Sequence, residues 1–354
     1  MTRRAMLALL PTSLHLAAEQ SLPRKSKPLP MGSELVRLLD PVTEMPVTRL
    51  TSPVSNSFLP VAANQFVSTK DRFLVFSSDR TGHNAPFRLD LRTGALSQLG
   101  PTDDVCPPSL CLDASNRILN LLDRSTLKEI GLNGKRIHVL GENVTAFSFG
   151  SSTADLVVVS GGNLYLGANQ STKLVEDVAG WCMVRPAGSG CLFGREASAG
   201  EREFWYVPLS GAQPKTTLLA KGRISNPYWS PDGRSVLFLR EISDGNFTRS
   251  VIHEVFPETC QEQHVTNTSQ FASFAPNADG SVFVGASRSK AQPVVVLLLR
   301  SSRRELTLCE HGAKNAAAVS PVFSPDSRRV YFQSDREGKS ALYSVNVESL
   351  IEST

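Results

Sequence analysis

The sequence predicts an all-β protein, a seven-bladed β-propeller closed by an N-terminal strand that completes the last blade. Three observations lead to this fold class. Short runs of β-favouring residues alternate with turn residues on a scale of about five to eight residues. The phrase that combines them recurs along the chain, and its copies are spaced at ~40 residues, the period of four-stranded propeller blades.

The clearest copy of the phrase spans Pro321 to Val345 and reads PVFSPDSRRVYFQSDREGKSALYSV. A Ser-Pro-Asp-Ser turn separates its first two strands, because Pro fixes φ and Asp supports a tight connection. The alternation in Val330 to Phe332 has the period of a strand that buries side chains against a neighbouring blade. Related phrases stand at Pro227 to Leu239 and at Phe66 to Leu91.

Laid end to end, these phrases make residues 36–350 a single propeller domain. The predicted units are 58–99, 102–141, 144–177, 179–221, 223–266, 269–311 and 315–350. The last unit supplies only three strands. We therefore expect Val47 to Leu50 to add the fourth strand, which would pair the two ends of the chain and remove an exposed sheet edge.

Residues 1–18 have the charged, apolar and small-residue parts of an export signal, and Arg3 and Arg4 resemble a twin-arginine signal. The alternative is an untargeted N-terminus with two chance arginines. Export predicts a periplasmic or secreted protein, with residues 19–35, rich in Pro, Lys and Ser, as a linker. No later stretch has the ~18 apolar residues of a membrane span.

The composition, 41% hydrophobic and 20% charged residues with a net charge of +4, is that of a soluble, turn-rich globular protein. The charge is too small and too scattered to predict nucleic-acid binding, although an anionic ligand remains compatible with it. Cys106 with Cys111, or Cys182 with Cys191, could form local disulfides in an oxidising compartment. The alternative, favoured by the usual burial of cysteine, is free thiols in the core.

Local catalytic or metal-binding motifs are absent from the sequence: it has no C-x-x-C, H-x-H, H-E-x-x-H or G-x-S-x-G. Ser-Asp-Arg occurs twice, at 78–80 and 334–336. Because this triplet recurs with the fold, we expect its Asp to accept hydrogen bonds from the turn and to pair with Arg, in preference to an acid or base role.

Several phrases together resemble the oligogalacturonate lyase family of seven-bladed propellers. These are DPVTEMPVTRLTS, FLVFSSDRTG, SQFASFAPNADGSVFVGAS, RRELTLCEH and the 321–345 phrase, so the likeness is most specific from Ser269 to Val347. The rest of the chain is equally similar to the wider group of TolB-like propellers. The resemblance implies β-elimination on short pectic uronides, with Mn²⁺ held by histidines and a glutamine and a further histidine as base.

The residues at the family's site positions depart from that pattern. Asn315, Ala318 and Ser320 stand where the family has a glutamine and two histidines, Gln270 replaces a ligand histidine, and Arg240 replaces the base. Alanine has no donor atom, a hydroxyl is a poor substitute for imidazole, and a guanidinium cannot act as a base at ordinary pH. The resemblance therefore predicts a divergent member without the family's metal site, and Mn²⁺ as cofactor only if lyase activity is retained.

The sequence thus predicts that the funnel face binds an anionic oligosaccharide or a protein partner, with Arg240, Gln270 and His311 as candidate ligand-binding residues. No catalytic or metal residue is assigned. An active oligogalacturonate lyase with a differently built metal site and a TolB-like periplasmic scaffold are the two alternatives.

Overall fold

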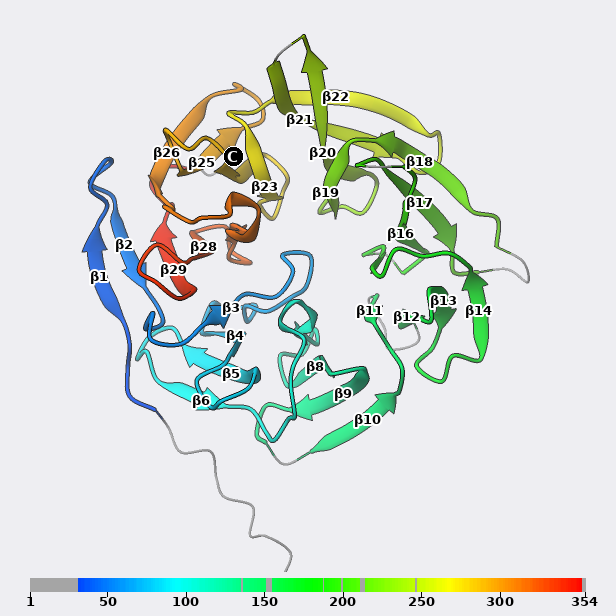
Figure 1. Cartoon of the computed structure of the whole chain (residues 1–354), viewed down its shortest axis with the longest axis horizontal. Helices are drawn as coiled ribbons and strands as arrows, with labels where there is room; N and C mark the ends of the chain where they lie inside the picture. Colours follow the sequence, from blue (N-terminus) through cyan, green and yellow to red (C-terminus); the bar gives the residue numbers. More distant parts are fainter. Residues whose placement is uncertain are drawn as a thin grey trace, which may run out of the picture.

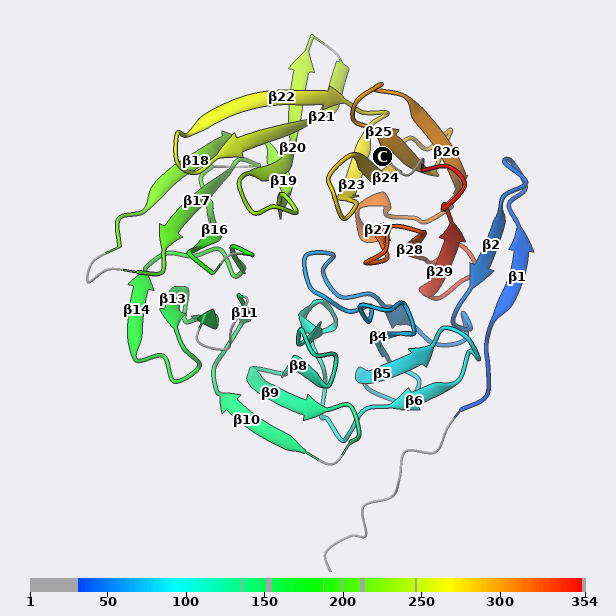
Figure 2. The same cartoon turned by 180° about the vertical axis from the view of Figure 1, so that it is seen from behind.

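Seven β-sheets stand around a central channel, each sheet forming one blade of a ring (Figure 1). The computed structural model describes residues 31–134, 136–150, 155–186, 188–198, 200–210, 214–245 and 247–351. The predicted export signal at 1–18 lies outside the described residues, as does the linker up to residue 30. Seen from behind, the ring has the same order of blades, running once around the channel in sequence order (Figure 2).

The first three blades are four-stranded antiparallel sheets whose lowest-numbered strand borders the channel. Blade 1 comprises β3 (Ser57–Phe58), β4 (Phe73–Ser78), β5 (Ala85–Asp90) and β6 (Leu96–Gln98). Blade 2 follows the 3-10 turn η1 (Pro107–Ser109) and comprises β7 (Cys111–Leu112), β8 (Ile118–Asp123), β9 (Thr126–Gly131) and β10 (Ile137–Gly141). Blade 3 comprises β11 (Ala146–Ser148), β12 (Val157–Ser160), β13 (Asn163–Leu166) and β14 (Thr172–Val175).

The next three blades repeat the plan with longer strands. Blade 4 comprises β15 (Cys182–Val184), β16 (Gly190–Glu196), β17 (Arg202–Pro208) and β18 (Thr217–Gly222). Blade 5 comprises β19 (Ile224–Trp229), β20 (Val236–Asp244), β21 (Phe247–Phe256) and β22 (Gln261–Asn267). Blade 6 comprises β23 (Phe271–Pro276), β24 (Val282–Ser287), β25 (Val294–Leu299) and β26 (Glu305–Glu310).

Blade 7 joins the two ends of the chain and confirms the predicted closure. It contains β27 (Val322–Phe323), β28 (Arg329–Ser334) and β29 (Ala341–Asn346), preceded by the 3-10 turn η3 (Ala316–Ala318). β2 (Pro46–Arg49) pairs antiparallel with β29, so that Val47 lies opposite Val345. The sequence of residues 37–52 predicts two strands joined by a turn, and the first of them, β1 (Val36–Leu39), pairs with β2 and makes this blade five-stranded, which was not predicted.

The Ser-Pro-Asp turns form because their side chains close the turn themselves. In blade 5 the Ser230 hydroxyl donates to Asp232 Oδ1 at 2.6 Å and accepts from the Ser235 N–H at 3.0 Å. Ser324 and Asp326 repeat the 2.6 Å contact in blade 7. The recurring phrase therefore specifies the hairpin between the two strands nearest the channel, as the sequence predicted.

The hydrophobic core is divided into layers between successive blades. The layer between blades 5 and 6, for example, joins Leu237 and Ile252 to Phe274 and Phe283, all 1% exposed or less. Inner strands such as β4 and β24 are buried at every position because both faces of a blade are covered by its neighbours. The same interleaving occurs around the ring, which leaves the channel as the feature not filled by core packing.

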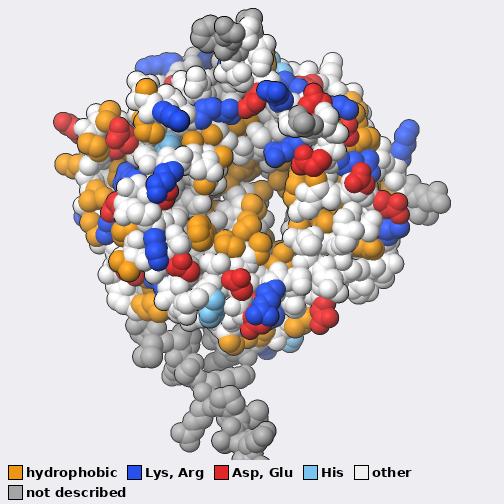
Figure 3. Space-filling model, viewed as in Figure 1, with side chains coloured by type: hydrophobic (Ala, Val, Ile, Leu, Met, Phe, Trp, Pro, Cys, Tyr) orange, Lys and Arg blue, Asp and Glu red, His pale blue; other side chains and the backbone are white. Residues whose placement is uncertain are grey.

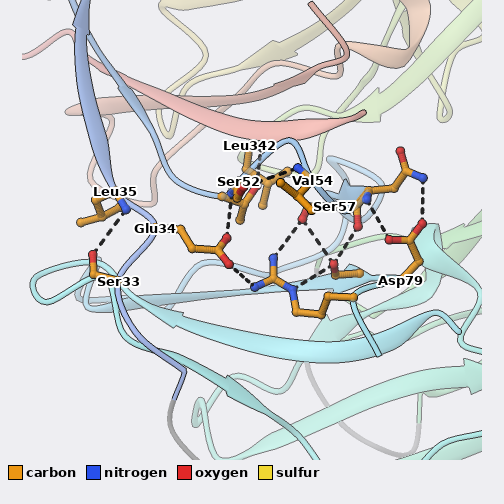
Figure 4. Close-up of polar contacts among 12 residues, drawn as sticks. Ser33, Glu34, Leu35, Ser52, Val54, Ser57, Asp79 and Leu342 are labelled. Atoms are coloured by element: carbon orange, nitrogen blue, oxygen red, sulfur yellow. Dashed lines mark hydrogen bonds and ion pairs between the residues drawn. The ribbon is translucent and has the colours of Figure 1, made fainter. Parts of the chain in front are cut away.

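A polar network fastens the closed blade 7 to blade 1 (Figure 4). The Glu34 carboxylate contacts Arg80 Nη1 at 3.0 Å through one oxygen and accepts from the Ser52 N–H at 2.7 Å through the other. The Arg80 side chain is 7% exposed and its guanidinium lies over Phe87, 5.0 Å from the ring centroid. Residues 31–35, within the predicted linker, therefore contact the propeller.

The repeated Ser-Asp-Arg triplets are part of the scaffold, but neither arginine pairs with the aspartate of its own triplet as expected, since Arg80 contacts Glu34 and Arg336 contacts Glu337. Asp79 accepts from the Asn56 N–H at 2.8 Å and Asp335 from the Lys314 N–H at 2.9 Å, so both carboxylates support backbone as predicted, but in segments 23 and 21 residues earlier and not in their own turn. Arg80, however, pairs with Glu34 and not with Asp79, because the N-terminal segment crosses its side of the blade. Glu34, the partner of Arg80, lies 46 residues away in the sequence.

All six cysteines are free thiols in the structure, Cys182 and Cys191 included. Among the described residues no helix has the length and apolar character needed to cross a membrane.

Candidate functional site

The central channel is a cavity of about 1250 Å³ bounded mainly by the first strands of blades 2 to 7 and, in blade 1, by residues 61–67. The space-filling view shows a hollow in the middle of the ring with hydrophobic side chains on its walls (Figure 3). A ligand bound in this cavity would therefore contact side chains from several blades at once. This makes the channel the candidate ligand site of the fold.

Blade 1 narrows the channel with a loop at 59–65, which reaches toward the middle of the ring (Figure 1). The loop interrupts the strand nearest the channel between Phe58 and the bridge at Val67. It is fixed to blade 2, because Asn64 Nδ2 donates to the Leu110 carbonyl at 3.1 Å and the Val61 N–H donates to the Pro108 carbonyl at 3.1 Å. The constriction is thus anchored from two blades.

Aromatic side chains from several blades contribute to the channel wall. Phe147 and Phe149 of blade 3 meet edge to face at 5.6 Å, and Tyr228 of blade 5 meets Phe274 of blade 6 at the same centroid distance. Trp181, at the entry to blade 4, lines the same cavity. Phe274 and Phe147 are 1% and 8% exposed and belong to the core behind the wall, whereas Phe149, Trp181 and Tyr228 are partly exposed and present aromatic surface to the cavity.

The position of Trp181 depends on a glycine in the neighbouring strand. A Cβ atom at Gly194 would lie 2.5 Å from the indole nitrogen, so a larger residue there would collide with the ring. The indole also packs edge to face on Phe204 at 5.7 Å. These contacts fix how the ring lies at the channel.

Neutral polar groups accompany the aromatic rings where the inner strands begin. Pairing of Trp229 with Val236 and of Phe323 with Val330 makes Asn226 and Ser320 equivalent positions in blades 5 and 7. Both residues line the cavity and both are left-handed, with φ of 50° and 45°. Non-glycine residues in this conformation are uncommon and are enriched at functional sites.

Some of these polar groups have unused hydrogen-bonding capacity. Asn226 Nδ2 donates to the Ala272 carbonyl at 3.1 Å, while its Oδ1 accepts no bond from the described part of the chain. Within that part, the Ser320 and Tyr228 hydroxyls also make no hydrogen bond. Burial raises the pKa of Tyr228, so its phenol stays neutral and can donate to a ligand.

The charged groups of the cavity are acidic. Among the described residues, its lining includes Asp113 and Glu129 but no Lys, Arg or His. Burial acts to raise the pKa of Asp113, but hydrogen bonds from Ser115 and from the Ile118 and Arg117 N–H groups outweigh it and hold the pKa below its usual value. Asp113 is therefore ionised at neutral pH.

The segment from Asn315 to Ser320, where the resemblance implies metal ligands, forms η3 and its caps. Asn315 Oδ1 accepts from the Ala317 N–H at 3.1 Å and so caps the turn. The Ala318 carbonyl accepts from Gln333 Nε2 at 2.6 Å, which fixes the segment to β28. Its side chains contribute one occupied amide oxygen and one free hydroxyl, which do not fit a histidine-held Mn²⁺ site.

No other metal-ligand cluster compensates: in the portions of the chain that the structure describes, no three His, Cys, Asp or Glu side chains are grouped to hold an ion.

The three candidate residues predicted from the sequence lie outside the cavity lining. Arg240 forms a bidentate pair with Glu262, with both N–O distances at 2.8 Å, and donates to the Lys221 carbonyl at 3.0 Å. Glu262 also contacts His253 Nδ1 at 2.6 Å. The guanidinium is thus engaged in linking strands of blades 4 and 5.

Gln270 and His311 lie on either side of the end of β24, but they differ in how accessible their side chains are to a ligand. Gln270 is exposed and left-handed, with φ of 55°, and its backbone carbonyl accepts from the Arg288 N–H. His311 is 1% exposed, its Nε2 lies 2.9 Å from the Ser287 carbonyl, and its Nδ1 accepts from the Ala313 N–H at 3.0 Å. Ligand binding by Arg240, Gln270 and His311 stays a prediction.

The channel residues were missed because the sequence places them far apart. Trp181, Tyr228 and Asn226 belong to different repeats or to parts of repeats that look structural. Aligning NPYWSPDG, which begins at Asn226, with SPVFSPDS, which begins at Ser320, would have shown that the same blade position carries a polar residue twice.

Seven antiparallel blades closed by an N-terminal strand define the class as a seven-bladed β-propeller, and comparisons with known proteins narrow it. No family model matches the chain. An oligogalacturonide lyase from Pectobacterium atrosepticum is 22% identical over 170 residues, a match that spans 42% of this chain and only 43% of that enzyme.

Two solved structures have closely similar folds. An oligogalacturonate lyase in complex with manganese aligns over 91% of this chain and 98% of its own, at 18% identity and a TM-score of 0.78. An oligogalacturonate lyase from Vibrio parahaemolyticus aligns over 92% and 100%, at 19% identity and a TM-score of 0.76. The protein is therefore an oligogalacturonate lyase-like seven-bladed propeller, and at these identities the likeness is one of fold.

Proposed function

We propose that this protein binds a carbohydrate in its central channel and does not cleave uronides with a histidine-held metal. The observation that carries the proposal is the contrast between an open channel walled by aromatic rings and a segment, Asn315 to Ser320, with almost no metal donors. Aromatic faces beside neutral hydrogen-bonding groups suit sugar rings, which have apolar C–H faces and polar edges. The fold likeness to lyases named for oligogalacturonate supports a carbohydrate as the ligand class.

A cleavage assay on oligogalacturonate tests the catalytic half of the proposal. The full chain, incubated with the substrate and Mn²⁺, should give no rise in the ultraviolet absorbance of unsaturated uronides. A rise that requires Mn²⁺ and disappears with a chelator would show an active lyase, whose metal site would then have to be built from other residues.

Calorimetric titration tests the binding half. Oligogalacturonides, added in their acid and methyl-ester forms to the full chain with chelator present, should give saturable heat with at least one form. Absence of heat with both forms would contradict carbohydrate binding and favour the other partner class predicted from the sequence, a protein on the funnel face.

We further propose that the protein is exported, on the evidence of residues 1–18 alone. Cell fractionation should find the protein in the periplasm or medium, and replacing Arg3 and Arg4 with Lys should retain it in the cytoplasm if the signal is of the twin-arginine type. Cytoplasmic recovery of the unaltered chain would contradict export.

A further inference from the structure

We propose that the channel selects an uncharged pyranose ring, such as a methyl-esterified uronide, and rejects the corresponding polyanion. This inference rests on the proposed function, because it names the charge class of the carbohydrate bound at the same site. It differs from the anionic ligand predicted from the sequence, and the difference arises from the cavity lining.

The charges around the cavity disfavour an anionic ligand. A carboxylate that leaves water for an apolar cavity loses several kcal/mol of hydration unless a cation or several donors replace it. No Lys, Arg or His side chain of the described residues lines this cavity, whereas Asp113 and Glu129 do. A second negative charge would be both poorly solvated and repelled.

The nearest guanidinium considered from the sequence is already neutralised. Arg240 holds Glu262 in a bidentate pair, and its side chain is 20% exposed. Recruiting it for a ligand would break its two hydrogen bonds to Glu262 and its bond to the Lys221 carbonyl. The cationic residue that would suit a uronate is therefore engaged elsewhere.

The aromatic and hydroxyl groups of the cavity match the surfaces of an uncharged sugar ring. Trp181 and Tyr228 present aromatic surfaces to the cavity, and the Tyr228 and Ser320 hydroxyls have no partner within the described residues. A pyranose ring places C–H groups against an aromatic face and hydroxyls toward such neutral donors and acceptors. Esterification removes the charge of a uronate and adds an apolar methyl group, so it improves both matches.

The test is a paired titration of the wild-type full chain with trigalacturonic acid and with its trimethyl ester, at neutral pH with chelator present. The two ligands have the same rings and differ in charge. We expect the ester to bind at least about ten-fold more tightly, because only the acid form must bury carboxylates without cations.

A set of variants places the ligand in the channel. Trp181→Ala should weaken binding of the ester about ten-fold, whereas Trp181→Phe, which keeps an aromatic face, should retain most of the affinity. Trp205→Ala is the matched control, because Trp205 bonds Glu203 at 2.9 Å and is not part of the cavity lining. Circular dichroism of each variant verifies folding.

The outcomes separate this inference from the proposed function. Equal or tighter binding of the acid form would overturn selection for an uncharged ring while leaving carbohydrate binding in place. An unchanged affinity of a folded Trp181→Ala protein would overturn the channel as the site. No binding of either ligand would overturn both the inference and the carbohydrate function.

Discussion

The closure between blades 7 and 1 and the wall of the central channel place polar groups in contrasting surroundings. At the closure, Glu34, Arg80 and Asp79 each have identified partners, and Arg80 is almost fully buried. On the channel wall, the Ser320 and Tyr228 hydroxyls have no hydrogen-bonding partner within the described residues. Satisfied buried groups stabilise a fold, whereas groups left open beside a cavity are available to a ligand. We therefore expect changes at the closure to act on stability and changes at the channel to act on binding.

The largest effect is expected at the closure. Arg80→Ala removes a guanidinium that contacts Glu34 and covers two phenylalanine rings, so the free energy of unfolding should fall by about 3 kcal/mol. Denaturant unfolding measures this. The control is Arg202→Ala, which breaks an exposed pair with Glu196 and should change stability by less than ~1 kcal/mol. Similar losses in the two variants would contradict a special role for the closure.

A smaller effect links the core to the channel. In Gly194→Ala the new methyl group must displace the Trp181 indole, so we expect a loss of about 2 kcal/mol in the free energy of unfolding and weaker binding of the ester ligand. Gly32→Ala is the matched control, since nothing lies within 4 Å of its added Cβ. If both variants bind the ligand like the wild type, the fixed position of Trp181 is irrelevant to binding.

The stability of the protein should depend on pH through His311, a buried residue outside the channel. Burial lowers the pKa of His311 below its ordinary value of 6.5, so as pH falls through 6.5 the unfolded chain takes up a proton before the folded one. The unfolded state then binds more protons, and the free energy of unfolding should decrease, by up to about 1.4 kcal/mol per pH unit.

His311→Gln removes this titration. The variant should be less stable than wild type at pH 8, and the gap should narrow as the pH falls toward 5 because only the wild type loses this contribution. Unfolding curves recorded across that pH range measure the gap. A gap that stays constant with pH would mean that His311 does not titrate differently on folding.

The smallest effect on stability is expected at the channel wall. Tyr228→Phe removes a hydroxyl with no partner in the described chain, so the free energy of unfolding should change by less than ~0.5 kcal/mol. Affinity for the ester should nevertheless fall about five-fold, the worth of one hydrogen bond. A clear loss of stability with unchanged affinity would mean that Tyr228 stabilises the fold, as the closure residues do, and does not bind the ligand.

Much of the fold followed from the sequence because each blade is specified locally. Turns such as Ser230 to Asp232 close through their own side chains, and strands alternate within six or so residues, so periodicity reveals both. Closure by β2 was also predictable, because the count of strands in the last unit was incomplete. The place of β1 as a fifth strand of that blade was not predictable, since a fifth strand completes no repeat.

The site was less predictable, because it is assembled by closing the ring. Trp181, Tyr228 and Ser320 come from blades 4, 5 and 7, and no local pattern relates them. The residues singled out by resemblance were located by family position. A position in an alignment does not reveal that Glu262 forms an ion pair with Arg240, or that His311 is buried with both ring nitrogens hydrogen-bonded.

Protection of a cavity thiol is the most direct test that the channel, and not another face, holds the ligand. Cys106 lines the cavity and is partly exposed, whereas Cys260 is exposed elsewhere and serves as an internal control. Burial raises the pKa of Cys106, so its alkylation is slow at neutral pH, where the methyl ester is stable, and is followed over a long time course. Saturation with the trimethyl ester of trigalacturonic acid should slow alkylation of Cys106, in proportion to the bound fraction, and leave Cys260 unaffected. Equal alkylation of Cys106 with and without saturating ligand would contradict binding in the channel.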